Sequence, residues 1–214
     1  MKKVVIIGAG CLGRETLWLV RDLIRAGARI EPLGFVDDDP GKAGKNIMGL
    51  KVLGPIRWLE RPRKNLEAVL AVGEIKVKRG LALKLKKRGL KFITLIHPTA
   101  VFSEDAVIGE GSIIFPGVVM SAQVRIGRFV LLNPGITLSH DVQIGDWSLI
   151  GSGAHFAGQA RVGEGCQIGT GVNVIPQKTI GDWCVVGAGA CVISDLPART
   201  VSVGVPARVI KTLS

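Results

Sequence analysis

The 214-residue sequence is poor in aromatic residues and cysteine, and both shortages narrow the classes of protein that it can encode. Phe, Trp and Tyr make up 5% of the residues, against 29 glycines, which is typical of a fold with many tight turns and little room for large rings. The four cysteines form no CxxC pair, so the sequence indicates neither a zinc ribbon nor a thioredoxin-like motif. We expect reduced thiols in a cytoplasmic protein.

Long hydrophobic runs are also missing. The apolar run that begins at Val4 ends at Gly8, too early for a secretory signal or a membrane span, so we expect neither. No stretch has the composition of a low-complexity disordered segment. Apolar residues nevertheless make up 47% of the chain, which is enough for a full buried core.

The chain is strongly basic, with a formal net charge of +11. Nucleic acid is the first partner to consider for such a charge. The basic stretch at 76–91 carries no interleaved aromatic residue, and no nucleic-acid motif surrounds it or the stretch at 57–64. A solvated helix face is a commoner explanation, and a basic surface also attracts nucleotide phosphates and coenzyme A. We expect no nucleic-acid partner.

From Ile96 onward an apolar residue leads each of seventeen successive hexads. Four residues after each leading residue comes a second inward position, small or β-branched except at Lys178 and Leu196, and glycine often follows the leading residue. Six residues form one short strand and one sharp turn, and three such units close a triangular coil, so the sequence predicts a parallel β-helix of five to six coils. The leading residues are Ile96, Phe102, Ile108, Ile114, Met120, Ile126, Leu132, Leu138, Ile144, Ile150, Phe156, Val162, Ile168, Val174, Ile180, Val186 and Val192.

Residues 1–95 alternate strand and helix patterns instead, which predicts a small Rossmann-like α/β domain with a parallel sheet. The β-helix domain then covers 96–214, and its tail from Pro197 leaves the hexad register, with a turn at 204–208 and a short helix or strand at 209–213. The N-terminal predictions are a strand at Lys2–Ile7, a helix at 14–25, a strand at Ile30–Val36, a loop at 40–55, a strand at 66–72, a helix at 75–88 and a strand at 92–95.

A glycine pattern, Gly8-x-Gly10-x-x-Gly13, lies between the first strand and the first helix. In that position glycines let a phosphate approach the backbone, and the helix N-terminus favours negative charge. Asp37 follows the second strand, where the partner of a ribose hydroxyl belongs. The domain is too small for a full dinucleotide fold, so a mononucleotide or a nucleotide-sugar fits better than NAD. The alternative is a glycine-rich turn without a ligand.

His140 is the third residue of its hexad, so we expect it to face outward near a corner of the β-helix. An imidazole there can remove a proton from a sugar amine or hydroxyl, and Asp141 can fix its tautomer. The alternative is that His140 is a surface histidine without a catalytic role. His97 and His155 are predicted to be structural or solvated. Because His140 and His155 are not a whole coil apart, we expect no zinc site and no metal.

Five motifs occur along the chain: Gly8–Gly13, Asp37–Asp39, Ile96–Ala100, Ser139–Asp141 and Gly204–Arg208. Together they resemble the NeuD/PglD-like sugar O- and N-acetyltransferases of the hexapeptide-repeat acyltransferase superfamily, over the whole chain. The resemblance implies a left-handed β-helix and a homotrimer with active sites at the subunit interfaces. Acetyl-CoA lies between neighbouring β-helices in that family, and the nucleotide of the sugar lies on the N-terminal domain.

The resemblance also implies roles for individual residues. The family places a general base at His140, assisted by Asp141, and an asparagine near the acceptor sugar at Asn133. Two departures affect contacts to the acceptor and the coenzyme: Leu12 and Leu149 stand where the family often has histidine. The remaining implied residues are Gly10, Cys11, Leu12 and Gly13 on the phosphate side, Asp37 and Asp38 on the nucleoside side, and Gly158, Thr170 and Ala188 along the coenzyme groove.

The resulting prediction is an acetyl-CoA-dependent transferase that acetylates the amino group of a nucleotide-linked amino sugar in bacterial surface glycan biosynthesis. The first alternative is O-acetylation of sialic acid or another sugar. Others are a different acyl donor such as succinyl-CoA, a zinc hydratase, and a non-catalytic protein that binds nucleotide-sugars. The sequence does not specify the sugar, the nucleotide or the pathway.

Overall fold

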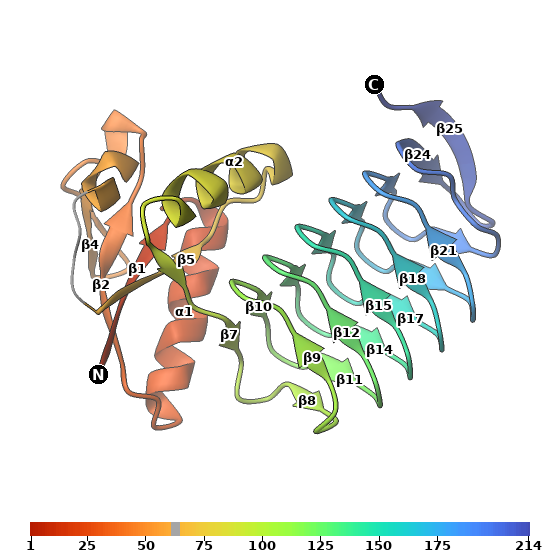
Figure 1. Ribbon diagram of the computed structural model, residues 1–214, viewed down its shortest axis with the longest axis horizontal. Coiled ribbons are helices and arrows are strands. Elements are labelled where there is room, and N and C mark those ends of the chain that lie inside the picture. Colours follow the sequence, from red (N-terminus) through yellow and green to blue (C-terminus); the bar gives the residue numbers. More distant parts are fainter. Residues whose placement is uncertain (61–64) are drawn as a thin grey trace. The chain divides into compact units, whose positions relative to one another are not determined.

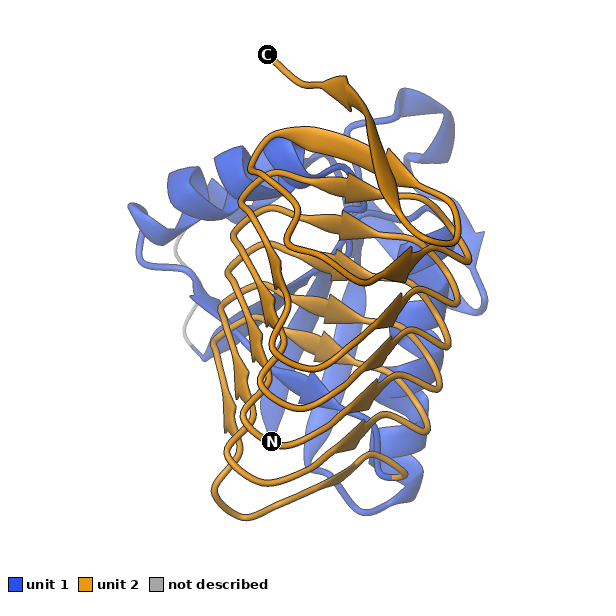
Figure 2. Cartoon of the chain, turned by 90° about the vertical axis from the view of Figure 1, so that its right-hand side faces the viewer, with its two compact units in different colours: residues 1–98 blue, residues 99–214 orange. Residues whose placement is uncertain are grey.

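The computed structural model covers residues 1–214 and describes residues 1–60 and 65–214. The chain divides into two compact units, residues 1–98 and residues 99–214 (Figure 2). Unit 1 contains the glycine-rich segment and unit 2 contains nearly all of the hexad repeat. The predicted phosphate-binding segment and the predicted general base His140 therefore lie in different units.

Unit 1 is built on a six-stranded sheet in the order β3-β4-β2-β1-β5-β6 (Figure 1). β1 pairs in parallel with β2 on one side and with β5 on the other, so the strand order reverses at β1. Ligands of α/β sheets bind outside the carboxyl ends of strands at such a switch point. The elements are β1 (Lys2–Ile7), α1 (Cys11–Arg25), β2 (Ile30–Val36), the 3₁₀ turn η1 (Pro40–Lys42), β3 (Asn46–Ile47), β4 (Leu50–Gly54), η2 (Ile56–Glu60), β5 (Leu66–Leu70), α2 (Ile75–Lys86), β6 (Lys91–Phe92) and β7 (Leu95–Ile96).

Most predicted elements of unit 1 are confirmed, some with different ends. β1 and β2 have the predicted bounds, whereas β5 and α2 stop slightly before their predicted ends. α1 begins at Cys11 instead of Arg14, because its first turn packs on the preceding loop: a Cβ on Gly13 would touch main-chain atoms of Gly8. The strand predicted at 92–95 is two short strands, β6 and β7.

The prediction of a loop at 40–55 is wrong, since most of this segment has regular structure. Asp39 caps η1 by accepting a hydrogen bond from the Gly41 N–H, and Pro40 takes the first position. β3 and β4 form an antiparallel hairpin, and β4 also pairs with β2. A two-residue strand such as β3 is too short to show a period in the sequence. Of the basic stretch 57–64, residues 61–64 lie outside the described residues.

Unit 2 is a parallel β-helix whose short strands form three sheets, which we name faces 1, 2 and 3 (Figure 1). A strand pairs with the equivalent strand one coil later, as Thr137 does with His155, 18 residues on. Face 1 contains β10 (Ile113–Ile114), β13 (Leu131–Leu132), β16 (Leu149–Ile150), β19 (Gln167–Ile168), β22 (Val185–Val186), β24 (Thr200–Val203) and β25 (Arg208–Thr212). Face 2 contains β8 (Val101–Phe102), β11 (Val119–Met120), β14 (Thr137–Leu138), β17 (His155–Phe156), β20 (Asn173–Val174) and β23 (Cys191–Val192). Face 3 contains β9 (Val107–Ile108), β12 (Arg125–Ile126), β15 (Gln143–Ile144), β18 (Arg161–Val162) and β21 (Thr179–Ile180).

The leading residues of the hexads form the core of the β-helix, as the repeat predicts. Every leading residue from Ile114 to Val192 is buried. Phe102 is 43% exposed because β8 is the terminal strand of face 2. The second inward positions are also buried from Ser112 to Val172, so two apolar or small side chains per hexad fill the interior.

Two different glycine positions shape each coil, and only one of them follows from the hexad pattern. A Cβ on the glycine after a leading residue would collide with the next coil, as on Gly145, where it would lie 2.5 Å from a main-chain atom of Gly163. From Gly111 to Gly189 the fourth hexad residue instead adopts a left-handed backbone conformation, as at Gly153. That conformation holds whether or not the residue is glycine, since Trp147 (φ 67°) and Asp141 (φ 62°) adopt it too. The turn therefore follows from coil closure, not from glycine alone.

The tail of unit 2 forms a strand, which decides between the two predicted possibilities. β24 adds to face 1 in parallel with β22, and β25 folds back antiparallel to β24. The predicted turn at 204–208 connects the two strands and contains a cis Val205–Pro206 peptide bond.

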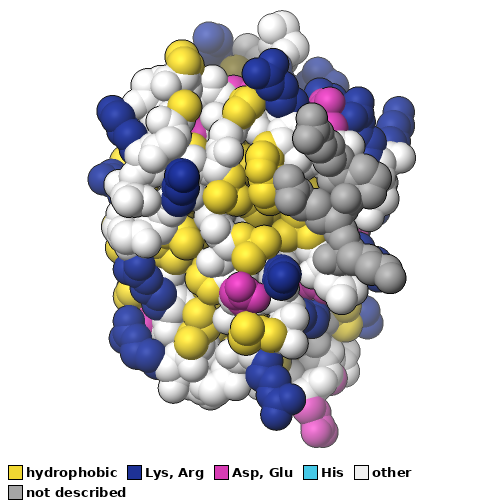
Figure 3. All heavy atoms as spheres, turned by 90° about the vertical axis from the view of Figure 1, so that its left-hand side faces the viewer, with side chains coloured by type: hydrophobic (Ala, Val, Ile, Leu, Met, Phe, Trp, Pro, Cys, Tyr) yellow, Lys and Arg dark blue, Asp and Glu magenta, His cyan; other side chains and the backbone are white. Residues whose placement is uncertain are grey.

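Positive charge is spread over the face of the molecule that Figure 3 shows. On the face shown in Figure 3, Lys and Arg side chains surround a central area of hydrophobic side chains. Two basic residues of the stretch 76–91 pair with one carboxylate, since Lys84 and Arg88 each lie 3.1 Å from Glu60.

In the described part of the chain, no helix combines the length and apolar character required to cross a bilayer.

Candidate active site

The candidate catalytic pair lies at the corner between faces 2 and 3. Leu138 points into the core at the end of β14, and the chain then turns outward before β15. His140 Nδ1 lies 2.9 Å from Asp141 Oδ2, and the two side chains are 57% and 41% exposed. The left-handed conformation of Asp141 is one that aspartate adopts more readily than most residues.

This contact settles which imidazole nitrogen is available for chemistry. A carboxylate oxygen only accepts hydrogen bonds, so in the neutral ring the proton lies on Nδ1 and points at Asp141. Nε2 then carries the free lone pair. An exposed imidazole with an unprotonated Nε2 and an anchored Nδ1 is suited to general-base catalysis.

Replacement of Asp141 by asparagine tests this arrangement, because asparagine also tolerates the left-handed backbone. We expect kcat to fall about 10- to 100-fold, less than the roughly 10⁴-fold found for a buried triad aspartate, because the exposed pair is screened by solvent. The melting temperature should stay close to that of the wild type. Steady-state kinetics and a thermal melt measure both quantities, and an unchanged kcat would show that Asp141 does not orient the base.

The structure brings only one of the three predicted coenzyme residues to the His140 corner. Gly158 follows His140 by one coil and lies against its ring. Thr170 and Ala188 lie at the corner between faces 1 and 2, in the turns after β19 and β22. Asn133 shares that corner, in the turn after β13, and its Nδ2 donates to the Ile150 carbonyl at 2.8 Å. Within one chain, face 2 separates the two groups.

The second cluster lies at the carboxyl ends of β1 and β2 in unit 1. Gly8 has a left-handed φ of 98°, and a Cβ there would lie 2.5 Å from the Ala71 carbonyl oxygen, so the fold itself requires this glycine. Gly10 is different, because nothing lies within 4 Å of the position of its Cβ. Gly10 precedes α1 as its N-cap residue and supplies no side-chain hydrogen bond, and the first turn of the helix contains no acidic residue. The helix N-terminus is therefore open to an anion.

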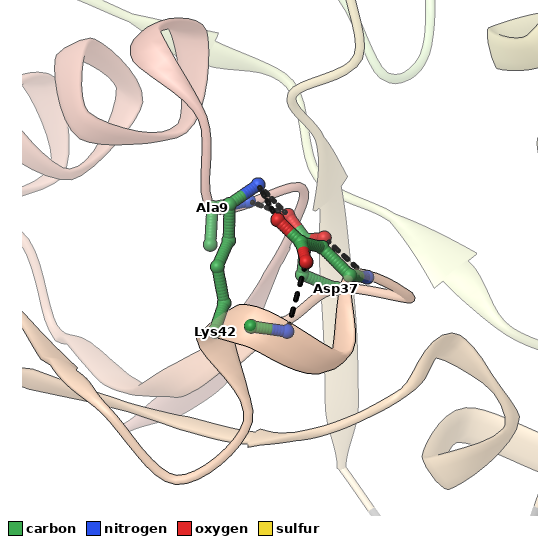
Figure 4. Close-up of polar contacts among 5 residues, drawn as sticks. Ala9, Asp37 and Lys42 are labelled. Atoms are coloured by element: carbon green, nitrogen blue, oxygen red, sulfur yellow. Dashed lines mark hydrogen bonds and ion pairs between the residues drawn. The ribbon is translucent and has the colours of Figure 1, made fainter.

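Asp37 joins this loop to the end of β2, as Figure 4 shows. Its Oδ2 accepts from the Ala9 N–H at 2.8 Å and from Lys42 Nζ at 3.1 Å, and its Oδ1 accepts from the Asp39 N–H at 2.9 Å. Burial raises the pKa of Asp37, but the hydrogen bonds from Ala9, Asp39 and Lys42 outweigh it and hold the pKa below its usual value. Lys42 carries the nearest positive charge, and no motif in the sequence identifies it.

A stability difference that depends on pH should follow from these contacts. Because the folded-state pKa of Asp37 is lowered, its ionised form stabilises the protein at neutral pH, and this contribution is lost as the pH falls through the folded-state value. We expect Asp37→Asn to lower the free energy of unfolding by about 1–3 kcal/mol at pH 7. The difference from the wild type should shrink as the pH falls below 3.8, the ordinary pKa of aspartate. Urea denaturation of the wild type and the variant, at pH 7 and at a pH below the aspartate pKa, measures this difference in unfolding free energy. An equal difference under the two conditions would contradict the proposed ionic contribution.

The other predicted residues of this edge lie nearby in sequence but make different contacts. Asp38 Oδ1 accepts from the Ile56 N–H at 2.7 Å, which ties β2 to η2. Cys11 is exposed at the first position of α1, and Arg14 donates to its Sγ at 3.3 Å. Leu12 is half-buried, and its carbonyl accepts from Thr16 Oγ1 at 2.7 Å.

The remaining histidines lie outside both clusters. His97 is 7% exposed and its Nε2 lies 3.0 Å from Asp22 Oδ2, a structural role that agrees with the prediction. His155 is exposed on face 2, with Nδ1 2.7 Å from Thr137 Oγ1. Leu149 is half-buried on face 1. Across residues 1–60 and 65–214, no three His, Cys, Asp or Glu side chains come together in a way that could hold a metal ion.

Known proteins resemble both parts of the chain. Residues 3–85 match the family model of the PglD N-terminal domain. Over 119 residues the chain is 38% identical to the UDP-N-acetylbacillosamine N-acetyltransferase of Bacillus subtilis (strain 168), covering 53% of this chain and 51% of that protein. The match thus spans about half the length of this curated relative.

Solved structures extend the similarity to the whole chain. The acetyltransferase domain of PglB from Neisseria gonorrhoeae FA1090, in complex with acetyl coenzyme A, is 31% identical with a TM-score of 0.89, covering 98% of this chain and 99% of that one. PerB from Caulobacter crescentus, in complex with CoA and GDP-perosamine, is 32% identical with a TM-score of 0.88, covering 99% and 98%. These similarities confirm the predicted fold, a Rossmann-like domain followed by a left-handed parallel β-helix.

Proposed function

Because the chain belongs to the PglD/NeuD-like family of sugar acetyltransferases, we propose that it transfers an acetyl group from acetyl-CoA to the amino group of a nucleotide-linked amino sugar. The product serves bacterial surface glycan synthesis, and the enzyme works in the cytoplasm. The observation that carries the proposal is the His140–Asp141 pair, an exposed imidazole with its Nδ1 anchored at 2.9 Å and its Nε2 free.

His140 is the general base of this reaction. As the acceptor nitrogen attacks the thioester carbonyl carbon and the new C–N bond forms, Nε2 takes a proton from that nitrogen. Asp141 stabilises the resulting imidazolium through Nδ1. When the tetrahedral intermediate collapses, the C–S bond breaks and the imidazolium gives its proton to the leaving thiolate. No acyl-enzyme and no metal ion is required.

The nucleotide binds at the carboxyl ends of β1 and β2. The open N-terminus of α1, from Gly10 to Gly13, faces the diphosphate, since its amide groups have no side-chain cap. Asp37 and Asp38 contribute on the nucleoside side. Lys42, at 3.1 Å from Asp37, offsets the carboxylate charge where an anionic ligand approaches.

The coenzyme binds between two copies of the chain in a homotrimer. The separation of His140 from Thr170 and Ala188 by face 2 supports this arrangement, because one chain alone does not bring the candidate base and these two residues together. The His140 corner of one copy and the corner of Asn133, Thr170 and Ala188 of a neighbouring copy then enclose one site. A monomeric active enzyme, seen by sedimentation together with turnover, would contradict this part of the proposal.

Release of free thiol from acetyl-CoA tests the function directly. The purified chain is mixed with nucleotide-linked amino sugars carrying UDP or GDP, and with free sialic acid, and thiol is followed with a chromogenic disulfide. Turnover on an amino sugar supports N-acetylation, whereas turnover on sialic acid alone would show an O-acetyltransferase. A folded oligomer that binds CoA and releases no thiol with any acceptor, or with succinyl-CoA as donor, would be a binding protein.

A further inference from the structure

Gly158 differs from most other glycines of the β-helix, because neither its backbone conformation nor the main chain of the next coil requires glycine at this position. Most of the described glycines of unit 2 either have a left-handed φ, as Gly153 does, or would drive a Cβ into the main chain of the next coil, as Gly145 would. Gly158 has neither property. The three heavy atoms nearest to its missing Cβ all belong to the imidazole ring of His140.

The ring of His140 occupies the space that a side chain at position 158 would fill. A Cβ there would lie 2.6 Å from Cε1 and 3.1 Å from Cδ2, and closest of all to Nε2. Gly158 itself is buried, although the His140 side chain is 57% exposed. Gln159, the residue after Gly158, keeps the two successive coils in register, since its N–H donates to the His140 carbonyl at 2.9 Å. Two features thus define the place of the imidazole: Nδ1 lies 2.9 Å from Asp141 Oδ2, and the Nε2 side of the ring occupies the position that a Cβ of residue 158 would take.

We propose that Gly158 is a positioning residue for the general base: its missing side chain provides the place in which His140 Nε2 lies. This inference rests on the proposed function, in which Nε2 takes the proton of the acceptor. A methyl group at position 158 forces the ring to rotate, which breaks the alignment of Nδ1 with Asp141 and moves Nε2 away from the acceptor. The ring is exposed and can move at little cost in stability, whereas displacement of a reacting atom by about 1 Å can cost about 10²-fold in rate.

The first test is Gly158→Ala in the full chain. The backbone conformation of Gly158 is compatible with alanine, so the thermal midpoint should change by less than about 3 °C. We expect kcat to fall about 10- to 100-fold, with the affinity for CoA, measured by calorimetry, within about threefold of the wild type. Gly80→Ala is the matched control, because nothing lies within 4 Å of the Cβ position of this helical glycine, and it should keep wild-type kcat. Wild-type kcat in Gly158→Ala would overturn the inference.

The second test reads the imidazole without any acetyl transfer. Nitrogen-15 chemical shifts show which ring nitrogen carries the proton, and the His140→Ala spectrum assigns the His140 signals. We expect the Nδ1–H form in the wild type and a mixture of both tautomers in Gly158→Ala. An unchanged His140 spectrum beside a lowered kcat would overturn the inference. A changed spectrum in a protein that acetylates nothing would leave the positioning role standing and remove the proposed function.

A double variant separates positioning from direct coenzyme contact, the role that the family resemblance implies for Gly158. Adding Gly158→Ala to His140→Ala should change neither the CoA affinity nor the thermal midpoint, because the ring that the methyl group meets is gone. Weaker CoA binding in both backgrounds would mean that Gly158 acts on the coenzyme, which overturns the inference. If Gly158→Ala alone fails to fold, recovery of the fold in the double variant supports the steric contact with His140, and no recovery contradicts it.

Discussion

Replacement of His140 by alanine is expected to lower kcat by about 10²- to 10⁴-fold, the usual contribution of a general base. The residue is exposed at a corner and its side chain contributes no core packing, so the fold and the oligomer should persist. The rate that remains would come from the alignment of donor and acceptor. Thiol release at saturating acetyl-CoA and acceptor measures kcat, and the affinity for CoA should change little.

His155→Ala is the matched control for this prediction. Both histidines are exposed on the β-helix, but His155 contacts Thr137 rather than a carboxylate and lies in the middle of face 2. We expect the control to keep turnover within about threefold of the wild type, since exposed substitutions outside a site rarely matter. Near wild-type turnover in His140→Ala would refute the assignment of the base.

Replacement of Leu85 by alanine should destabilise unit 1 by about 2–5 kcal/mol, the cost of truncating a fully buried leucine in a packed core. Leu85 is 0% exposed on α2. Loss of this side chain removes buried apolar surface and leaves a cavity that its neighbours fill only in part. Urea denaturation followed by circular dichroism at 222 nm reports this unit, because α1 and α2, the α-helices of the described chain, both belong to it.

Leu83→Ala provides the control on the same helix with the same chemical change. Leu83 is 47% exposed, so its truncation should alter the free energy of unfolding by no more than about 0.5 kcal/mol. Equal destabilisation by the two variants would mean that the helix presents a different face to the sheet than the structure shows.

Much of the fold can be predicted from the sequence, because its signals are local or strictly periodic. β1 is a run of apolar residues long enough for a buried strand, and its bounds at Lys2–Ile7 follow directly. The hexad repeat specifies which side chains point inward from Ile114 to Val192, since one skipped position would expose every following core residue. The same register places His140 on the outside near a corner.

The details of the candidate sites depend on residues that are distant in sequence. Asp37 meets Ala9 across 28 positions, and Lys42 joins them only because η1 turns the chain back toward the strand ends. The hairpin of β3 and β4 is stabilised by its pairing with β2, which no short sequence window contains. The left-handed turns at residues such as Trp147 follow from closing a coil and override the preference of the residue itself.

The sequence by itself determined the two kinds of unit, the inward and outward alternation of the repeat, and the outward position of the candidate base beside Asp141. Only the tertiary structure decided that the His140 ring fills the space beside Gly158, and that Lys42 meets Asp37. The physical reason is that periodicity specifies which way a side chain points. Contacts between side chains also require the closure of each coil, which brings residues 18 positions apart into register.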